Sequence, residues 1–337
     1  MKAIVHERYG PANEVLSLRN IDLPVLGDDE VLVRVRAASV HADVWHVVTG
    51  WPYVLRLMGN GLLRPRKRVP GTDLAGHVER VGRNVSRFAA GDEVFGGRPM
   101  MQGWVNGGTF AEYAAFPQNM LAHKPPGVTF GQAASTVASG AIALINLGPP
   151  DALAGKNVLI NGAGGAVGTI AVQIAKAHGA RVVGVDVAEK LAMMGQLGAD
   201  YTIDFTREDP TRSGERYDLV LDVASTLSLD DCRRILAAHG IYVSIGHTSY
   251  GTVGGPVLGT IPHMLRLMAR SPFDAHLRKL NAFKMPSHHD ILTALETLLA
   301  TGTLTPIIAR TFPLSEVPAA IRCLVEGRAA GRIVVTP

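Results

Sequence analysis

The chain has 337 residues, 47% of them hydrophobic and 18% charged, which is typical of a folded globular protein and excludes an intrinsically disordered one. Its length suits about two domains. The net charge of +4 would suit an anionic ligand, but the densest basic run, RPRKR at 64–68, has no interleaved aromatic residues. We therefore expect a solvated loop there and no nucleic-acid partner.

The chain's few cysteines and its apolar segments bear on its compartment. Cys232 and Cys323 lie far apart, within predicted amphipathic helices, so we expect no disulfide framework. The opening MKAIVHERYG carries charges where a secretory signal would be apolar. The longest uncharged run, residues 125–150, predicts a buried core helix better than a membrane span, which needs about 20 mostly apolar residues. These features predict a cytoplasmic protein without a membrane partner.

The first 125 residues predict a β-rich, partly open barrel. Strand-like segments separated by glycine and proline turns lie at 2–10, 31–39, 77–82, 92–97 and 110–116.

From Asn157 the pattern changes to short apolar strands alternating with helices of 3.6-residue periodicity, which predicts a doubly wound parallel α/β sheet, the Rossmann arrangement. The strands are expected at 157–160, 181–186, 201–204, 217–224 and 241–246, and the helices at 166–179, 188–198 and 228–240.

The tail returns to a mixed pattern. We expect a strand at 279–285, a helix at 287–302 capped by Ser287 and Asp290, a strand at 306–314, a helix capped by Ser315, and a last strand at 332–335. The stretch from Gly246 to Pro262 carries no assignable element.

A glycine-rich turn in NVLINGAGGAVG (157–168) joins a predicted strand to a helix. A dinucleotide needs small residues there, because its pyrophosphate approaches the backbone and the helix N-terminus. The residues at the fingerprint positions are Ala163, Gly165 and Gly168, so alanine replaces the first glycine. A tight turn of any α/β protein is the alternative. The candidate cofactor-binding residues are Gly162, Ala163, Gly164, Gly165, Ala166 and Val167.

The following strand ends in Asp186, an acidic residue placed to hydrogen-bond an adenosine ribose. Its carboxylate would repel the 2′-phosphate of NADP. Lys190 is a further candidate contact that would favour NADP(H), although a lysine in a first helical turn is usually solvated. We therefore expect NAD(H), with NADP(H) as the alternative.

The chain resembles the medium-chain dehydrogenase/reductase superfamily, in particular its zinc-independent quinone-oxidoreductase-like branch. The motifs that carry the resemblance are VPGTDLAGHVERVGRNVSRFAAGDEVFG (69–96), GGTFAEYAAFP (107–117), NVLINGAGGAVGTIAVQIAKAHGA (157–180), LGADYTIDFT (197–206) and GRIVV (331–335). The resemblance implies a GroES-like catalytic domain (1–126 and 286–337) and an inserted Rossmann domain (127–285). It also implies hydride transfer from NAD(P)H to quinones, enals or enones, in a cleft where nicotinamide meets substrate, and a homodimer.

The resemblance also bears on metals. Zinc-containing members carry a catalytic cysteine and a histidine at positions that here are His41 and Thr72, and this chain has no cysteine before Cys232. A catalytic zinc needs three protein ligands and an open position. We therefore expect neither a catalytic nor a structural zinc.

Two residues are candidates for metal-free chemistry. His41 stands where zinc-independent relatives commonly have asparagine, so the resemblance implies a position near the nicotinamide, where an imidazole could donate a proton. Its alternative role is a hydrogen bond to the loop or to the cofactor ribose. Tyr53 could polarise a substrate carbonyl or simply pack as an aromatic residue. Trp45 and Trp51 are candidate pocket residues.

Asp43 and His46, spaced i,i+3, are expected to form a surface pair.

The carboxyl ends of later strands supply further candidates by the same resemblance. Val223 to Ser225 would border the adenosine, and Ile245, Gly246 and His247 would contact the nicotinamide through their backbone. Phe283 would touch the nicotinamide ring.

Three functions remain open at this point. The first is a zinc-independent NAD(P)(H)-dependent reductase of a quinone, enone or related carbonyl compound. The second is a metal-free secondary-alcohol dehydrogenase. The third is a non-catalytic, redox-sensing nucleotide-binding protein.

Overall fold

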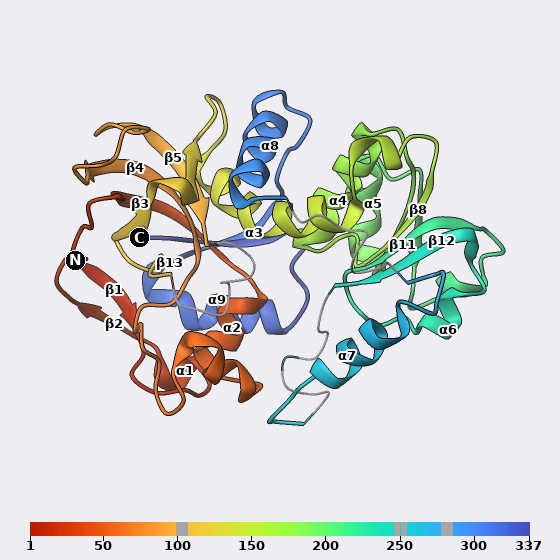
Figure 1. The fold of residues 1–337 in the computed structure, drawn as a ribbon, viewed down its shortest axis with the longest axis horizontal. Helices are drawn as coiled ribbons and strands as arrows, with labels where there is room; N and C mark the ends of the chain where they lie inside the picture. The colour runs from red at the N-terminus through yellow and green to blue at the C-terminus, as the bar shows by residue number, and fades with distance from the viewer. Residues whose placement is uncertain (99–106, 246–249, 251–254, 278–285) are drawn as a thin grey trace. The chain divides into compact units, whose positions relative to one another are not determined.

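The computed structural model describes residues 1–98, 107–245, 250, 255–277 and 286–337 (Figure 1). Its internal contacts divide the chain into a first unit, Met1–Ala141, Gly254–Gly259 and Ser287–Pro337, and a second unit, Ile142–Val253 and Thr260–Pro286.

The first unit contains a seven-stranded sheet in the order β13-β14-β3-β4-β5-β7, with β6 paired to β3. The strands are β3 (Glu30–Val40), β4 (Asp73–Val81), β5 (Glu93–Gly97), β6 (Tyr113–Pro117), β7 (Leu121–His123), β13 (Ile308–Pro313) and β14 (Arg332–Thr336). A separate hairpin joins β1 (Lys2–Val5) and β2 (Ser17–Asn20). Strand β14 pairs with β3, so the tail of the chain completes a sheet whose first strand is Glu30–Val40.

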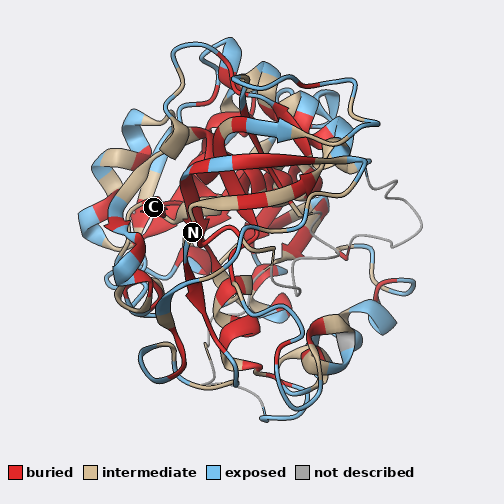
Figure 2. Ribbon diagram, turned by 90° about the vertical axis from the view of Figure 1, so that its left-hand side faces the viewer, coloured by how far each residue is buried: buried red, intermediate tan, exposed pale blue. Residues whose placement is uncertain are grey.

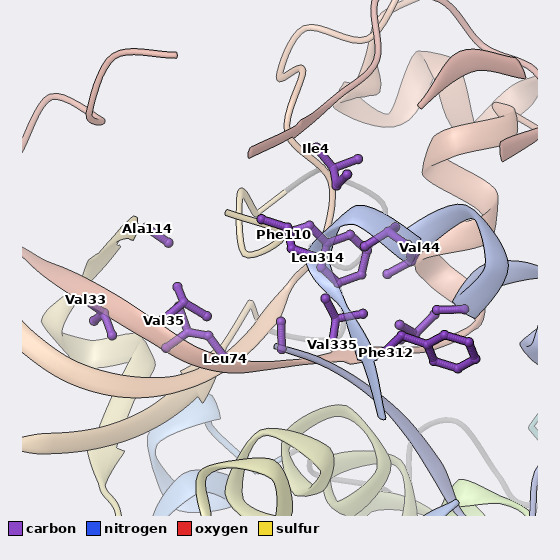
Figure 3. Packing of buried hydrophobic residues seen from close by; sticks show 14 of the residues in the cluster. Ile4, Val33, Val35, Val44, Leu74, Phe110, Ala114, Phe312, Leu314 and Val335 are labelled. Atoms are coloured by element: carbon purple, nitrogen blue, oxygen red, sulfur yellow. The ribbon is translucent and has the colours of Figure 1, made fainter. Parts of the chain in front are cut away.

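The hydrophobic core of the first unit lies on this sheet (Figure 3). Val33 and Val35 of β3 project from alternate positions of the strand, as the two-residue period of a β-strand requires. They belong to one buried cluster with Phe110, Leu314 and Val335, which are far apart in sequence. Burial of these apolar side chains stabilises the association of the two distant chain segments.

Helices of the first unit are α1 (Ala12–Val15), α2 (Ala42–Thr49), α8 (His288–Ala300) and α9 (Val317–Val325). The predicted cap of α8 is confirmed, because Ser287 and Asp290 form a reciprocal capping box. The predicted Ser315 cap is wrong: residues Leu314–Glu316 form a 3-10 turn, and Glu316 precedes α9 without a side-chain cap. Buried Leu314 belongs to the core, and this packing decides the turn.

Helix α3 (Phe130–Leu147) is the described helix with the length and apolar composition of a membrane span, and 61% of it is buried within the protein. This burial matches the predicted core helix.

The second unit has a five-stranded parallel sheet in the order β10-β9-β8-β11-β12. The strands are β8 (Asn157–Asn161), β9 (Arg181–Asp186), β10 (Tyr201–Asp204), β11 (Tyr217–Asp222) and β12 (Leu236–Ser244), and the helices are α4 (Ala166–Ala177), α5 (Ala188–Gln196), α6 (Leu229–Cys232) and α7 (Ile261–Arg270). The order reverses beside β8, which is the topological switch point of a doubly wound sheet. The predicted fold class is confirmed.

One element of the second unit differs from expectation. The helix predicted at 228–240 is only α6, because Leu236 already pairs with Tyr217 of β11 and begins β12. Ile235 and Leu236 are buried in the sheet's core, so pairing and burial override the helical pattern. Helix α7 had no sequence assignment, and the strand expected at 279–285 lies outside the described residues.

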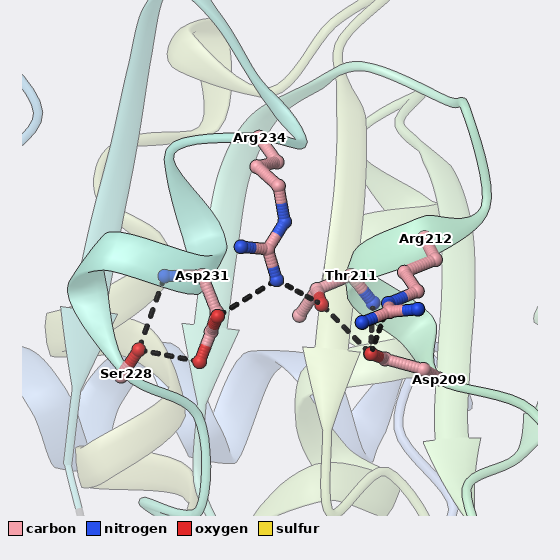
Figure 4. Close-up of polar contacts among 6 residues, drawn as sticks. All are labelled: Asp209, Thr211, Arg212, Ser228, Asp231 and Arg234. Carbon is pink, nitrogen blue, oxygen red and sulfur yellow. Dashed lines mark hydrogen bonds and ion pairs between the residues drawn. The ribbon is translucent and has the colours of Figure 1, made fainter.

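A surface network ties the segments that lead into β11 and β12 (Figure 4). Arg234 donates to Asp231 and to Thr211, and the Thr211 hydroxyl in turn donates to Asp209. The charged side chains Arg234, Asp231 and Asp209 are about half exposed, so their ion pairs contribute little to stability, whereas Thr211 is buried. Figure 2 shows the general pattern, with buried residues concentrated in the strands and exposed ones on loops and outer helix faces.

Candidate functional site

The glycine-rich loop lies in the second unit at the carboxyl end of β8 and leads directly into α4. Its amides are fixed from the neighbouring strand, since Gly162 N–H and Ala163 N–H both donate to the Val185 carbonyl, at 2.9 and 3.1 Å. Gly165 precedes α4 in an extended conformation and supplies no side-chain cap to the helix. The first turn of α4 therefore presents backbone N–H groups that can donate hydrogen bonds to an anion.

Small residues in this loop are required by close contacts. A Cβ on Gly168 would lie 2.1 Å from the Gly162 oxygen and 2.5 Å from the Ala163 Cα, so only glycine lets α4 pack this closely on the loop. Gly162 has φ of +82°, in the left-handed region. A Cβ on Gly164 would lie 2.6 Å from the Lys190 side chain. The alanine at 163 is accommodated, because its side chain is fully buried under the loop.

Asp186, at the carboxyl end of β9, joins the loop through its side chain. Its Oδ2 accepts the Gly164 N–H at 2.9 Å, and its Oδ1 accepts the Val187 N–H at 2.9 Å. The two amides thus hold the carboxylate against the loop. An ionised carboxylate has about four acceptor positions. The two amides and the Lys190 ammonium group occupy three of them, so one remains that could accept a hydroxyl.

The lysine beside Asp186 is Lys190. The expectation that its side chain is solvated is wrong, because the residue is buried. The Nζ lies 3.1 Å from Asp186 Oδ1, and both side chains are only 9% exposed. Lys190 belongs to the first turn of α5, where the i,i+4 spacing and the short loop place it over Gly164. The two side chains therefore form a buried ion pair beside the glycine-rich loop.

Polar residues that the sequence analysis missed connect three neighbouring strand ends. The Asn161 amide donates to Asp222 Oδ1 at 2.7 Å, and the Tyr242 hydroxyl donates to Asp222 Oδ2 at 3.1 Å. Burial is the main cause that raises the pKa of Asp222, and Tyr242 also has a raised pKa, again chiefly through burial. The signal was available, since Asn161 and Asp222 end parallel strands as Asp186 does.

The structure describes only some of the other candidate residues at strand ends. Val223 N–H donates to the Asn161 carbonyl and Ile245 N–H to the Asp222 carbonyl, which puts both backbones at the carboxyl edge of the sheet. Ser225 has φ of +51°, and its hydroxyl lies 2.8 Å from that of Ser244. Gly246, His247 and Phe283 lie outside the described residues.

A buried polar cluster surrounds His41 in the first unit. His41 follows β3 and precedes α2, and antiparallel pairing sets the end of β3 beside the start of β4. His41 Nε2 lies 2.5 Å from Thr72 Oγ1, and the Thr72 hydroxyl donates to Asp73 Oδ1 at 3.2 Å. Because that hydroxyl donates its hydrogen bond to Asp73, it accepts one from His41 Nε2–H. His41 is 6% exposed and Asp73 1%.

Asp73 organises this cluster. Its Oδ2 accepts the Ser39 hydroxyl at 3.0 Å and the Ala138 N–H at 3.1 Å, and lies 3.8 Å from His41 Nε2. Asp43 faces the other imidazole nitrogen, with Oδ2 at 3.6 Å from Nδ1. The sequence analysis missed Asp73 and Ser39, although Asp73 stands in the quoted motif.

The other candidates in this segment form a separate arrangement. The expected surface pair of Asp43 and His46 is wrong, because His46 is buried and its Nδ1 lies 2.6 Å from the Trp51 carbonyl oxygen. Trp45 and Trp51 pack against each other edge to face, with ring centroids 5.7 Å apart. Tyr53 is 45% exposed, with Arg56 stacked over its ring at 4.3 Å. No described contact joins Tyr53 to His41.

Comparison with known proteins identifies the family. Residues 27–126 match the alcohol dehydrogenase GroES-like domain, and residues 197–335 match a family described as zinc-binding dehydrogenase. The chain is 32% identical to an NAD-dependent alcohol dehydrogenase of Sulfolobus acidocaldarius, over 99% of each chain. The chain belongs to the medium-chain dehydrogenase/reductase superfamily.

Two further matches place the chain within this superfamily. It is 30% identical to the chloroplastic NADPH-dependent alkenal/one oxidoreductase of Arabidopsis thaliana, over 100% of the chain and 80% of the relative. The quinone oxidoreductase of Coxiella burnetii has a similar structure, with a TM-score of 0.79 and 25% identity over 100% and 99% of the two chains. The predicted membership of the quinone-oxidoreductase-like branch is confirmed.

The residues at the superfamily's catalytic zinc positions do not fit zinc. Thr72 is not among the usual zinc ligands, and its hydroxyl is engaged by His41 and Asp73. Within the described part of the chain no three His, Cys, Asp or Glu side chains are grouped as a metal site. The expectation that the protein works without zinc stays a prediction.

Proposed function

We propose that this member of the medium-chain dehydrogenase/reductase superfamily is an NAD(P)(H)-dependent oxidoreductase that reduces a quinone, enone or related carbonyl substrate. The observation that carries the nucleotide part is the Gly162–Gly165 loop with Asp186 held against Gly164 N–H at 2.9 Å. The substrate class is supported by the relatives named for quinone and alkenal/one reduction.

In this proposal the second unit binds the nucleotide. The uncapped first turn of α4 accepts the pyrophosphate, and the free acceptor position of Asp186 takes a ribose hydroxyl. The backbones of Val223 and Ile245 border the nucleotide along the carboxyl edge of the sheet. When bound, the reduced nicotinamide supplies a hydride.

In the first unit we propose His41 as the proton donor. Its Nε2–H donates a hydrogen bond to the Thr72 hydroxyl. Asp73 accepts the hydrogen of that hydroxyl and so orients its oxygen towards His41. In this scheme His41 acts as the imidazolium: it gives its Nδ1 proton to the oxygen or carbon that becomes basic after hydride addition, and the neutral Nε2–H tautomer that remains is the one held by Thr72. Thr72 and Asp73 are positioning residues in this scheme. Tyr53 remains a candidate substrate contact through its hydroxyl.

For the nucleotide, we propose a modest preference for NAD(H) with NADP(H) accepted. Asp186 disfavours a 2′-phosphate, whereas Lys190 at 3.1 Å balances the charge of that carboxylate and could turn to the phosphate. We further propose a cytoplasmic homodimer; light scattering of the purified protein measures its mass.

A binding titration followed by a substrate panel tests the function. NADH and NADPH are titrated by fluorescence, and turnover is then followed by nicotinamide absorbance with quinones, enones, aldehydes and secondary alcohols. Reduction of quinones or enones is expected. Turnover of simple alcohols with no enone reduction would favour the activity of the Sulfolobus relative, and tight nucleotide binding without turnover would indicate a sensing protein.

A further inference from the structure

The segment of residues 56–68, which we call the basic loop, exposes apolar side chains beside arginines. Leu57, Leu62 and Leu63 are 69%, 59% and 86% exposed. Arg64, Arg66 and Arg68 follow directly in the sequence, and the loop contains no acidic residue. The sequence predicts only a solvated loop here, but a solvated loop gains nothing from exposed leucines.

The exposure of these leucines is imposed by the fold. Buried Asn60 donates from its side chain to the Val47 carbonyl at 3.2 Å, and the Gly61 carbonyl accepts the Tyr9 hydroxyl at 2.6 Å. Arg66 N–H then returns to the Asn60 carbonyl at 2.8 Å. Anchoring on both sides leaves Leu62 and Leu63 at the tip, where they cannot fold back onto the core.

A pocket of about 420 Å³ lies in the same loop, lined by Glu7, Arg64, Pro65, Arg66 and Arg68. Glu7 is 3.1 Å from Arg19 and 3.5 Å from Arg68, so it is already balanced. No described contact occupies the guanidinium groups of Arg64 and Arg66. Guanidinium groups bind phosphate oxygens in a bidentate manner, so the pocket suits a phosphate group.

We propose that the basic loop docks this protein on an anionic lipid surface, with lipid phosphate groups in the Arg64–Arg66 pocket and the exposed leucines among the upper acyl chains. Charge complementarity favours this occupant, because residues 56–68 include no acidic residue. The proposal is independent of the substrate assigned above.

Vesicle flotation with the full-length protein tests it. Vesicles of phosphatidylcholine and phosphatidylglycerol in equal parts should bind the protein at least about tenfold more strongly than pure phosphatidylcholine vesicles, since each basic residue near such a surface contributes measurably. Raised salt should weaken the binding. Arg64→Gln with Arg66→Gln should reduce it about tenfold, and so should Leu62→Ser with Leu63→Ser. Inorganic phosphate should not displace the protein from vesicles at millimolar concentration.

The matched control is Val25→Ser. Val25 is 92% exposed, close to the 86% of Leu63, but it lies in a segment containing Asp22, Asp28 and Asp29. This variant should bind vesicles like the wild type, and all variants should titrate NADH normally. Equal binding to both vesicle types, or no effect of the arginine and leucine pairs, would overturn the proposal. So would a self-associated protein that the leucine variant dissociates, because the surface would then belong to a second copy.

Discussion

At the scale of single residues, the chemistry depends on which partners surround a titratable side chain. The resemblance implies that His41 and Thr72 occupy two positions of zinc ligands, and here they contact each other at 2.5 Å. The Thr72 hydroxyl donates to Asp73, so the three side chains form a hydrogen-bonded chain. Asp186 and Lys190 similarly balance each other, which no count of charges along the chain would show.

Replacing the proposed proton donor should slow catalysis and leave nucleotide binding intact. We expect His41→Asn to lower kcat about 100-fold and to flatten its pH profile, a loss typical of removing a general acid. Thr72→Val should shift the pH profile, and Thr72→Ser should restore it because it keeps the hydroxyl. Exposed His239→Asn is the control. Wild-type kinetics in His41→Asn would contradict the proposal that His41 donates the proton.

Changing the pair beside the loop should alter nucleotide choice. Lys190→Gln removes the positive charge and should raise the Kd for NADPH several-fold more than that for NADH, whereas Asp186→Asn should move the ratio the other way by about tenfold. Glu189→Gln, exposed on the same helix, should change neither. Isothermal titration of both nucleotides measures the ratio. Parallel changes for the two nucleotides in either variant would contradict the assignment.

At the scale of elements, the loop and α4 form a unit whose geometry depends on the absence of side chains. The contact of α4 with the loop passes directly through backbone atoms at Gly168. Helix α6 shows the opposite case, in which a strongly helical pattern yields to a strand because Leu236 pairs with Tyr217 and is buried. Local preference decides an element only where tertiary packing does not oppose it.

Two glycine substitutions in neighbouring helices should therefore have opposite effects. Gly168→Ala should lower the free energy of unfolding by about 2 kcal/mol or more, because its Cβ would meet backbone at 2.1 Å. Gly195→Ala in α5 has nothing within 4 Å and should raise it by up to about 1 kcal/mol. Urea unfolding measures both. Equal effects of the two substitutions would contradict the close packing of α4.

At the scale of the whole molecule, stability depends on buried groups that must stay uncharged. His6 follows β1 and is fully buried, and burial lowers its pKa from 6.5 to about 4. Burial likewise lowers the pKa of His288. Both histidines lie in the first unit, whose core joins the two ends of the chain, so protonating them opposes the packing that holds the chain together.

The protein should consequently lose stability in mild acid. The unfolded chain binds a proton at His6 below pH 6.5, but the folded chain does not until about pH 4, so stability present above 6.5 falls as the pH decreases through this window. The loss from His6 alone is about 3 kcal/mol. His6→Gln should show a smaller loss between pH 7 and 4 in urea unfolding. An identical pH dependence in this variant would contradict the assignment.

The sequence by itself determined the fold class and the strand-loop-helix context of the glycine loop, because alternation, periodicity and glycine placement are local and survive in the linear order. Its motifs gave the superfamily by resemblance. It named Asp186 because that residue ends the strand after the glycine loop, and His41 through the resemblance. It missed Asn161 and Asp222, although both end parallel strands as Asp186 does, and it missed Asp73, which begins β4.

The tertiary structure decided what each side chain meets. It buried Lys190 against Asp186, turned His46 towards Trp51, completed one sheet with the chain's last strand, and left the leucines of the basic loop uncovered. These outcomes depend on contacts between residues that are distant along the chain. The free energy of such contacts comes from burial and pairing in three dimensions, which no local pattern contains.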